Sequence, residues 1–190
     1  IGAPAARRVF PNPPTASSLE RAPLISAVDT SPVSCPLSLA ETSYLGVEIT
    51  ASAPWGMSFS RTGQGTLPRE PGIEQAVGQL VDDAVRACSG VSADAGIASA
   101  GAQLRILVER IEMNAFHDES PGMDTARVIV RAELITSPAS VLSVRGVGTL
   151  RAAPSTLTAA DLVTSAARAA MRDLWSELGA ARDKAQGGRS

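Results

Sequence analysis

The sequence predicts an α+β domain in which a sheet of about four strands carries two helices on one face. We expect the sheet to be antiparallel, with a mixed sheet as the alternative. Alternating apolar and polar residues run through Gln103–Met113, Thr125–Ile135 and Val141–Ala152, which is the two-residue period of half-buried strands. Apolar residues at helical spacing precede this block between Ile73 and Cys88, and follow it between Thr158 and Leu178.

One more strand is expected ahead of the first helix, which gives the order β-α-β-β-β-α. Leu45, Val47, Ile49 and Ala51 alternate with smaller or polar residues, as in a strand with one buried face. The following segment, from Pro54 to Pro68, suits either a second short strand or a surface loop.

The first predicted helix has recognisable signals at both ends. Pro71 suits the first turn because its missing N–H is not needed there, and Glu70 faces the positive end of the helix dipole. Ser89 and Gly90 are expected to end the helix.

The closing helix is expected to lie close to the sheet. Thr158 and Asp161 form a capping-box pattern at its start, and Gly179 is expected to end it. Its buried face is rich in alanine, and Gly146 and Gly148 lie on one face of the last strand. Residues without large side chains on both surfaces would let the two backbones approach each other.

Proline divides the chain into three parts. Seven of the 13 prolines precede residue 44, and proline supplies no N–H for a helix or a central strand. We therefore expect an extended tether over residues 1–43, one α+β domain over residues 44–179 and a flexible tail over residues 180–190.

Charge and hydropathy exclude several classes of protein. The net charge of −2 and the scattered arginines argue against nucleic-acid binding. No run of eighteen apolar residues is present, and the first residues lack the pattern of a secretory leader. A lipid anchor, if the protein has one, is expected upstream of Ile1, because no apolar stretch precedes Cys35.

Cys35 and Cys88 are the only cysteines. Their spacing matches no metal-binding or redox motif, and two interpretations stay open. They form one disulfide, as in an oxidising compartment, or they are two buried thiols.

No residue pattern points to catalysis. The single histidine, His117, lies in a turn with Asp118, Glu119 and Asp124, but their spacing matches no calcium loop, and a polar hairpin tip is the preferred interpretation. The sequence contains no nucleophile elbow and no phosphate-binding loop. We therefore predict a protein that is not an enzyme, with no catalytic residue, cofactor or metal site.

Large apolar side chains outside the regular patterns are the candidates for partner contacts, because aromatic residues are enriched at binding hot spots. These candidates are Phe10, Trp55, Phe59 and Trp175. An alternative places an apolar ligand between the sheet and the closing helix, as in helix-grip lipid carriers. The ligand would then be lined by Trp55, Met57, Phe59 and Met171.

The order of elements between Tyr44 and Leu178 resembles small periplasmic lipoprotein domains, especially the auxiliary lipoproteins of ABC-type transport systems and the related lipopolysaccharide-assembly lipoproteins. The resemblance is carried by the stripe Ile73–Cys88, the strands Leu104–Val108 and Arg127–Arg131, and the closing helix ending in Asp173-Leu174-Trp175. It implies a periplasmic or outer-membrane location and a non-catalytic role in a cell-envelope transport or export assembly. The expected partners are envelope proteins or further copies of the chain, with a lipid anchor as the only link to the membrane.

Overall fold

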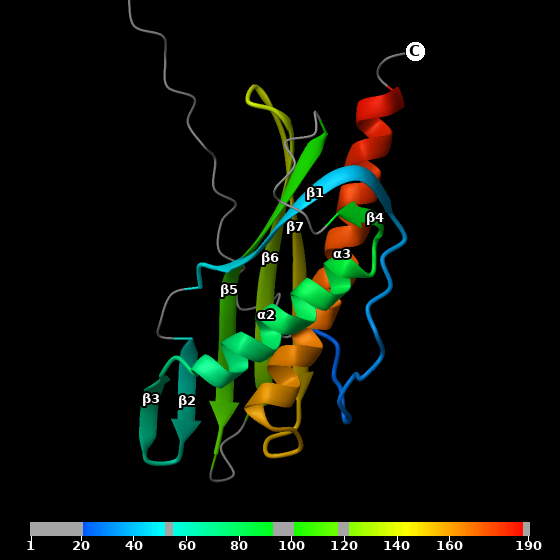
Figure 1. Cartoon of the computed structure of the whole chain (residues 1–190). Coiled ribbons are helices and arrows are strands. Elements are labelled where there is room, and N and C mark those ends of the chain that lie inside the picture. Colours follow the sequence, from blue (N-terminus) through cyan, green and yellow to red (C-terminus); the bar gives the residue numbers. More distant parts are fainter. Residues whose placement is uncertain (1–20, 52–54, 93–100, 118–121, 188–190) are drawn as a thin grey trace, which may run out of the picture.

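The computed structural model (Figure 1) describes residues 21–51, 55–92, 101–117 and 122–187. This part of the chain forms one mixed sheet and two long helices. The strands are β1 (Ser38–Ile49), β2 (Gly56–Ser60), β3 (Gly63–Leu67), β4 (Ser89–Ser92), β5 (Ala102–Phe116), β6 (Asp124–Ser137) and β7 (Ser140–Ala152). The helices are α2 (Pro71–Arg86) and α3 (Ala159–Gly187).

The predicted sheet of about four strands, taken to be antiparallel, was wrong. The sheet has seven strands and is mixed, because β1 pairs in parallel with β4 and β5, and β2 pairs in parallel with β5. The chain between β1 and β5 includes helix α2, and such a crossover lets two strands run in the same direction. The two helices and the antiparallel meander β5-β6-β7 are present as predicted.

Strands β1 and β2 share one edge of β5. Strand β1 pairs with the first half of β5, up to Ile49 opposite Val108, and β2 pairs with its last residues, from Gly56 opposite Met113 to Phe59 opposite Phe116. Figure 1 shows the two strands following each other along that edge. Strand β5 thus organises the whole sheet.

The pattern of β1 changes at Gly46, which has a φ of +93°. The pairing with β5 shifts register between Tyr44 and Val47, as at a β-bulge. Tyr44 is therefore buried and Leu45 is 45% exposed, which corrects the prediction that Leu45 lies on the buried face.

Two short segments supply the strands that the sequence pattern did not predict. The region between Pro54 and Pro68, where a strand and a loop were both open, contains the hairpin of β2 and β3. Ser89 and Gly90 do not end α2, which stops at Arg86, but begin β4. Gly90 has a φ of +79°, and a Cβ there would lie 2.8 Å from the backbone of Ala40, so this close pairing needs glycine.

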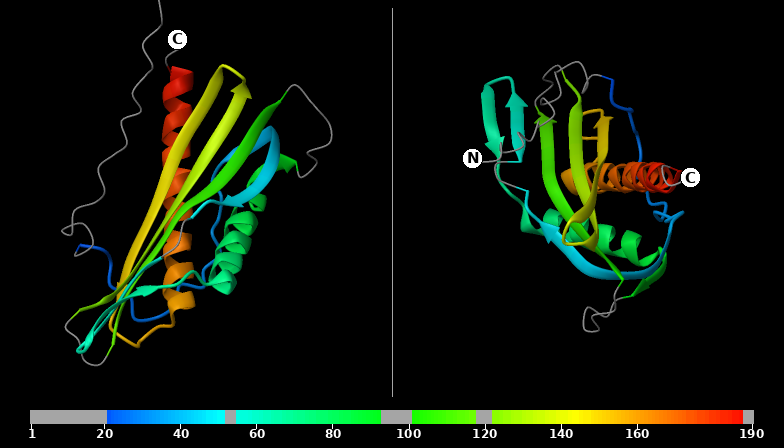
Figure 2. Two further views of the ribbon diagram at one scale, coloured as in Figure 1. Left: turned by 90° about the vertical axis from the view of Figure 1, so that its left-hand side faces the viewer. Right: turned by 90° about the horizontal axis from the view of Figure 1, so that it is seen from above.

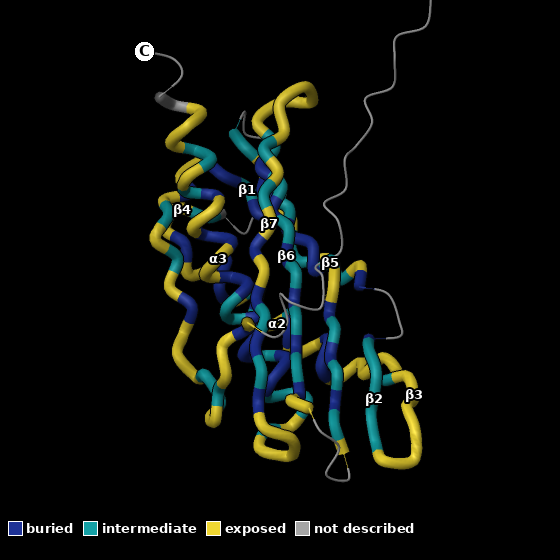
Figure 3. Tube along the Cα trace, turned by 180° about the vertical axis from the view of Figure 1, so that it is seen from behind, coloured by how far each residue is buried: buried dark blue, intermediate teal, exposed yellow. Residues whose placement is uncertain are grey.

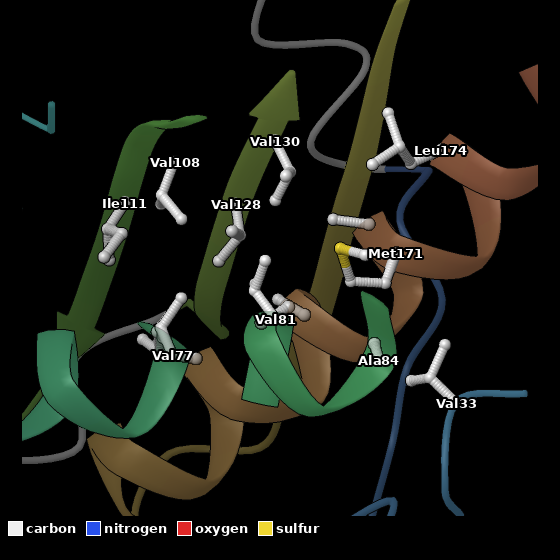
Figure 4. Close-up of a cluster of buried hydrophobic side chains, with 14 of the residues drawn as sticks. Val33, Val77, Val81, Ala84, Val108, Ile111, Val128, Val130, Met171 and Leu174 are labelled. Carbon is white, nitrogen blue, oxygen red and sulfur yellow. The ribbon is translucent and has the colours of Figure 1, made fainter. Parts of the chain in front are cut away.

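Both helices cover the same face of β5, β6 and β7. Helix α2 lies in front of these strands in Figure 1, and α3 runs along the β7 side of the sheet, as the two views of Figure 2 also show. In Figure 4, Val77 and Val81 of α2 face Val108 of β5 and Val128 of β6. All four side chains are completely buried, so the core lies between this face of the sheet and the helices.

Helix α3 approaches β7 as closely as the glycines were expected to allow. A Cβ on Gly146 would lie 2.1 Å from the carbonyl oxygen of Ala170, and one on Gly148 would lie 1.9 Å from that of Ala166. The prediction of close helix–sheet contact is confirmed. The helix does not end at Gly179, as expected, but continues to Gly187.

Residues 22–37, here called the N-terminal strap, run along α3 and hold to the body at several points. Arg151 N–H donates to Pro23 O and Ile25 N–H donates to Arg151 O, each at 2.8 Å. Asp29 accepts a hydrogen bond from Arg172 at 2.6 Å. The strap belongs to the stretch expected to be a tether. Strand β1 also begins within that stretch, at Ser38.

Candidate interaction surface

The aromatic residues expected at a partner interface have different surroundings in the structure. Trp55 and Trp175 are only 3% and 2% exposed, so both side chains belong to the packed core of this structure. Phe59 is half-buried and stacks on Phe116, with ring centroids 4.8 Å apart. Phe10 lies outside the described residues.

The two cysteines are joined. Cys35 of the strap and Cys88, just after α2, form a disulfide between positions that are 53 residues apart in the sequence. Of the two interpretations left open, the structure has the bonded form. The disulfide fixes the strap at the end of α2, and Asp29 fixes it to α3.

The outer face of β5–β7, opposite the helices, carries a row of ion pairs across four strands. Arg145 Nε lies 2.6 Å from Glu109 Oε2, and Arg131 Nε lies 3.1 Å from Glu109 Oε1. The row continues from Arg131 through Glu133 and Arg105 to Glu48 of β1. Hydrogen bonds to Glu109 and Glu48 raise the pKa of Arg145 and Arg105 respectively.

This row makes the outer face polar without giving it a strong field. Its arginines and glutamates alternate, so their charges largely cancel. Ion pairs as exposed as these contribute little individually. Arg127, Arg131 and Glu133 of β6 lie on this outer face, and no helix among the described residues covers it (Figures 1 and 3).

The outer edge of β7 is covered at two points in its second half. Val147 N–H donates to Asp173 Oδ2 of α3 at 2.8 Å. Further along, the strap pairs with Arg151. Because antiparallel strands alternate the direction of their backbone groups, Val147, Thr149 and Arg151 all direct theirs away from β6. The helix thus satisfies the N–H of Val147, and the strap satisfies both backbone groups of Arg151. In the described part of the chain no hydrogen bond reaches the outward groups of Thr149 between them.

The first half of the same edge is open. The register of β6 and β7 is unbroken from Val141 to Ala152, so Ser143 and Arg145 direct their N–H and C=O groups outward as Val147 does. In the described part of the chain no hydrogen bond reaches these outward groups. Val141 is 53% exposed, and Leu142 is half-buried. We call residues 141–145 the open edge.

The turn after β5, where His117 lies, is described only in part. His117 is exposed, and Asp124 is buried and accepts a hydrogen bond from Phe116 N–H at 2.8 Å. Asp118 and Glu119 lie outside the described residues. Among the residues that the structure describes, no group of three or more His, Cys, Asp or Glu side chains could hold a metal ion.

The space between sheet and closing helix is filled by side chains. Of the four residues expected to line an apolar ligand, Trp55 and Met171 belong to the packed core. Met57 and Phe59 are half-buried on β2. A groove of about 600 Å³ does exist, but it lies between the strap and the two helices, and none of these four residues lines it.

Within the described ranges, neither helix is long and apolar enough to cross a lipid bilayer.

No family model and no curated protein matches this chain. Among solved structures, it is similar to XCC0632 from Xanthomonas campestris, whose family is given as DUF330. That similarity has 18% identity and a TM-score of 0.40, and covers 86% of this chain and 95% of the other. A second structure, of an uncharacterized protein, has 11% identity and the same TM-score, with 80% and 95% covered. Similarities of this size assign no function.

Sequence reasoning missed the open edge. The alternation in β7 predicts a strand with one buried face, but it carries no signal of which neighbour pairs with which half. The glycines at 146 and 148 did mark where α3 makes contact. The open half differs in having Leu142 and Val144, in place of glycine, at the positions that face the helix side.

Proposed function

We propose that this protein is a non-catalytic interaction component of a bacterial cell-envelope assembly, active in transport or export. The observation that carries the proposal is the open edge of β7 beside a sheet face that no described helix covers. An unpaired strand edge is a ready template for a strand from another chain. Membrane attachment through a lipid anchor upstream of Ile1 belongs to the same proposal.

The disulfide supports the location. Structural disulfides persist in oxidising compartments such as the periplasm and are rare in the cytosol. Cys35–Cys88 links two segments that are far apart in the sequence, as a disulfide that stabilises a fold does. A periplasmic or outer-membrane-associated protein fits this bond.

The open edge fits an extended segment of a partner protein. Ser143 and Arg145 would supply the main-chain hydrogen bonds, which give affinity in strand addition. Leu142 and Val144, half-buried on the helix side, would contact apolar side chains on alternate positions of the incoming strand. The partner strand would therefore need a two-residue alternation of its own.

The lipid-carrier alternative has less support. It requires a chamber beneath the closing helix, whereas the glycines of β7 bring α3 against the strand and Met171 is completely buried. We therefore prefer the role in protein interaction to that of a lipid carrier.

The test replaces Ser143 with a photo-crosslinking amino acid in the native host, with the same replacement at exposed Glu177 as the control. We expect a specific protein crosslink from position 143. With the label moved to Arg145, Ser143→Pro should abolish the crosslink from position 145 and Ser143→Ala should leave it intact. Proline removes the outward N–H and alanine keeps it. Equal crosslinking from positions 143 and 177, or none from 143, would contradict the proposal.

A further inference from the structure

A surface groove of about 600 Å³ lies between the strap, α2 and α3. Its volume is within the range of small-molecule sites, which is about 300 to 1,000 Å³. Thr30, Pro32 and Val33 of the strap form one side. The groove lies away from the open edge of β7, so an inference about it does not rest on the proposed function.

The floor of the groove is apolar. Val33 and Ala84 are buried, and Leu80 is half-buried; Figure 4 shows Val33 beside Ala84. On α2, the small side chains of Ala76 and Ala87 continue this surface at either end. An alkyl chain lying on this floor would remove apolar surface from water on both partners.

One wall carries an unpaired cation. Arg168 of α3 lines the groove and is half-buried. Of the basic side chains in the described ranges, only Arg21, Arg168 and Lys184 take part in no hydrogen bond or ion pair. Arg21 and Lys184 are exposed to solvent, so Arg168 alone combines partial burial with a free guanidinium.

The opposite wall carries a negative charge, on a carboxylate that already accepts a hydrogen bond. Asp83 of α2 accepts a hydrogen bond from Gln79 Nε2 at 2.8 Å. An anionic group would be repelled from this wall and attracted to Arg168, whose planar guanidinium suits a carboxylate or a phosphate. The groove therefore orients a ligand with its head on α3 and its chain along α2.

We propose that the groove binds a single molecule of an amphiphile with one apolar chain and an anionic head, with Arg168 holding the head. A carboxylate and a phosphate share the chemistry that Arg168 recognises, so the head group is assigned as an oxyanion. Thr164, the other α3 residue in the lining, uses its hydroxyl to donate to Ala160 O at 2.8 Å. The Thr164 hydroxyl proton is therefore already used, and Arg168 would bind the head group.

The experiment titrates the purified chain with decanoate, decyl phosphate, decanol and acetate, each below its micelle-forming concentration. Calorimetry gives the affinity, and amide chemical shifts of Leu80 and Arg168 report the place of binding. We expect decanoate or decyl phosphate to bind at least about tenfold more tightly than decanol, and acetate to bind negligibly. The stronger of the two anions identifies the head group.

Two variants and one control locate the site. Arg168→Gln should weaken binding of the anionic amphiphile at least about tenfold. Ala76→Trp should weaken it by filling the groove at an exposed helix position without touching Arg168. Lys184→Gln removes a free cation from the same helix outside the groove and should change nothing.

Three results would overturn the proposal. These are equal affinities for decanol and decanoate, shift changes confined to residues outside the groove, or wild-type affinity in Arg168→Gln. Circular dichroism of each variant separates lost binding from lost folding, and Ala76→Trp keeps the test valid should Arg168→Gln fold poorly.

Discussion

The two halves of strand β7 have the same alternating sequence pattern and opposite surroundings. From Gly146 to Ala152 the strand lies against α3 and the strap, and the outward N–H groups of Val147 and Arg151 have partners. From Val141 to Arg145 the outward groups have none in the described part of the chain. The difference therefore comes from segments distant in sequence: α3 supplies a carboxylate and the strap supplies a carbonyl, and these accept hydrogen bonds from one half of the edge only.

The largest expected effect comes from releasing the strap that covers part of the second half. The variant Cys35→Ser/Cys88→Ser opens a loop of 53 residues and should lower the free energy of unfolding by about 4 kcal/mol in the chain-entropy account. Urea unfolding measures it, with the reduced wild-type protein as the control. Hydrogen exchange at Arg151 should accelerate, and that at Ser143 should not. A loss below about 1 kcal/mol would mean that the strap is held by its other contacts.

Gly148→Ala tests the contact between α3 and the second half. The new Cβ would lie 1.9 Å from Ala166 O, so the helix must move, and the expected cost is about 3 kcal/mol. Gly72→Ala is the matched control because nothing lies within 4 Å of its Cβ position. Equal thermal stability of the two variants would show that α3 shifts without cost.

Proline placed at the two kinds of edge position compares the halves directly. Val147→Pro removes the N–H that donates to Asp173 and should cost about 1 to 2 kcal/mol. Ser143→Pro removes an outward N–H with no partner and should cost less than about 0.5 kcal/mol, because such edge positions tolerate proline. Urea unfolding of both variants gives the difference, and equal costs would show that residues 141–145 are not open.

The smallest effect concerns the charged contact between strap and α3. A hydrogen bond from Arg172 lowers the pKa of Asp29 below its ordinary 3.8. The contact therefore stabilises the fold above that pH, and its contribution is lost as the pH falls through the lowered pKa. Because the pair is partly exposed, Asp29→Asn should cost less than about 1 kcal/mol at pH ~7. A difference between wild type and variant that does not change as the pH falls would contradict this assignment.

Periodicity found the elements whose environment is uniform along their length. The stripe of α2 and the alternation of β6 are visible because each contacts the same core throughout, whereas the alternation of β5 changes phase at a register shift between Val108 and Arg110. The capping pattern at Thr158 and Asp161 also holds, with Asp161 N–H donating to Thr158 Oγ1 at 3.1 Å. Such local signals predicted the helices and the antiparallel meander.

The remaining strands depend on partners far away in sequence. Strand β4 has four residues and exists because Gly90 fits against Ala40 of β1. Strands β2 and β3 are rich in glycine, serine and threonine, and their pairing needs the end of β5. Trp175 lies off the centre of the α3 stripe but is buried, because the helix is enclosed on more sides than the sheet alone provides. No local pattern contains this information.

The shared edge of β5 has a consequence for the order of assembly. Strands β5, β6 and β7 and helix α3 are consecutive in the chain and can form from near neighbours, whereas β1 and β2 must return to β5 across an intervening helix. Contacts between distant segments close more slowly, so we expect the C-terminal half to acquire protection first. Pulsed hydrogen exchange during refolding would show Val130 protected before Val47, and the reverse order would make the parallel pairings the nucleus.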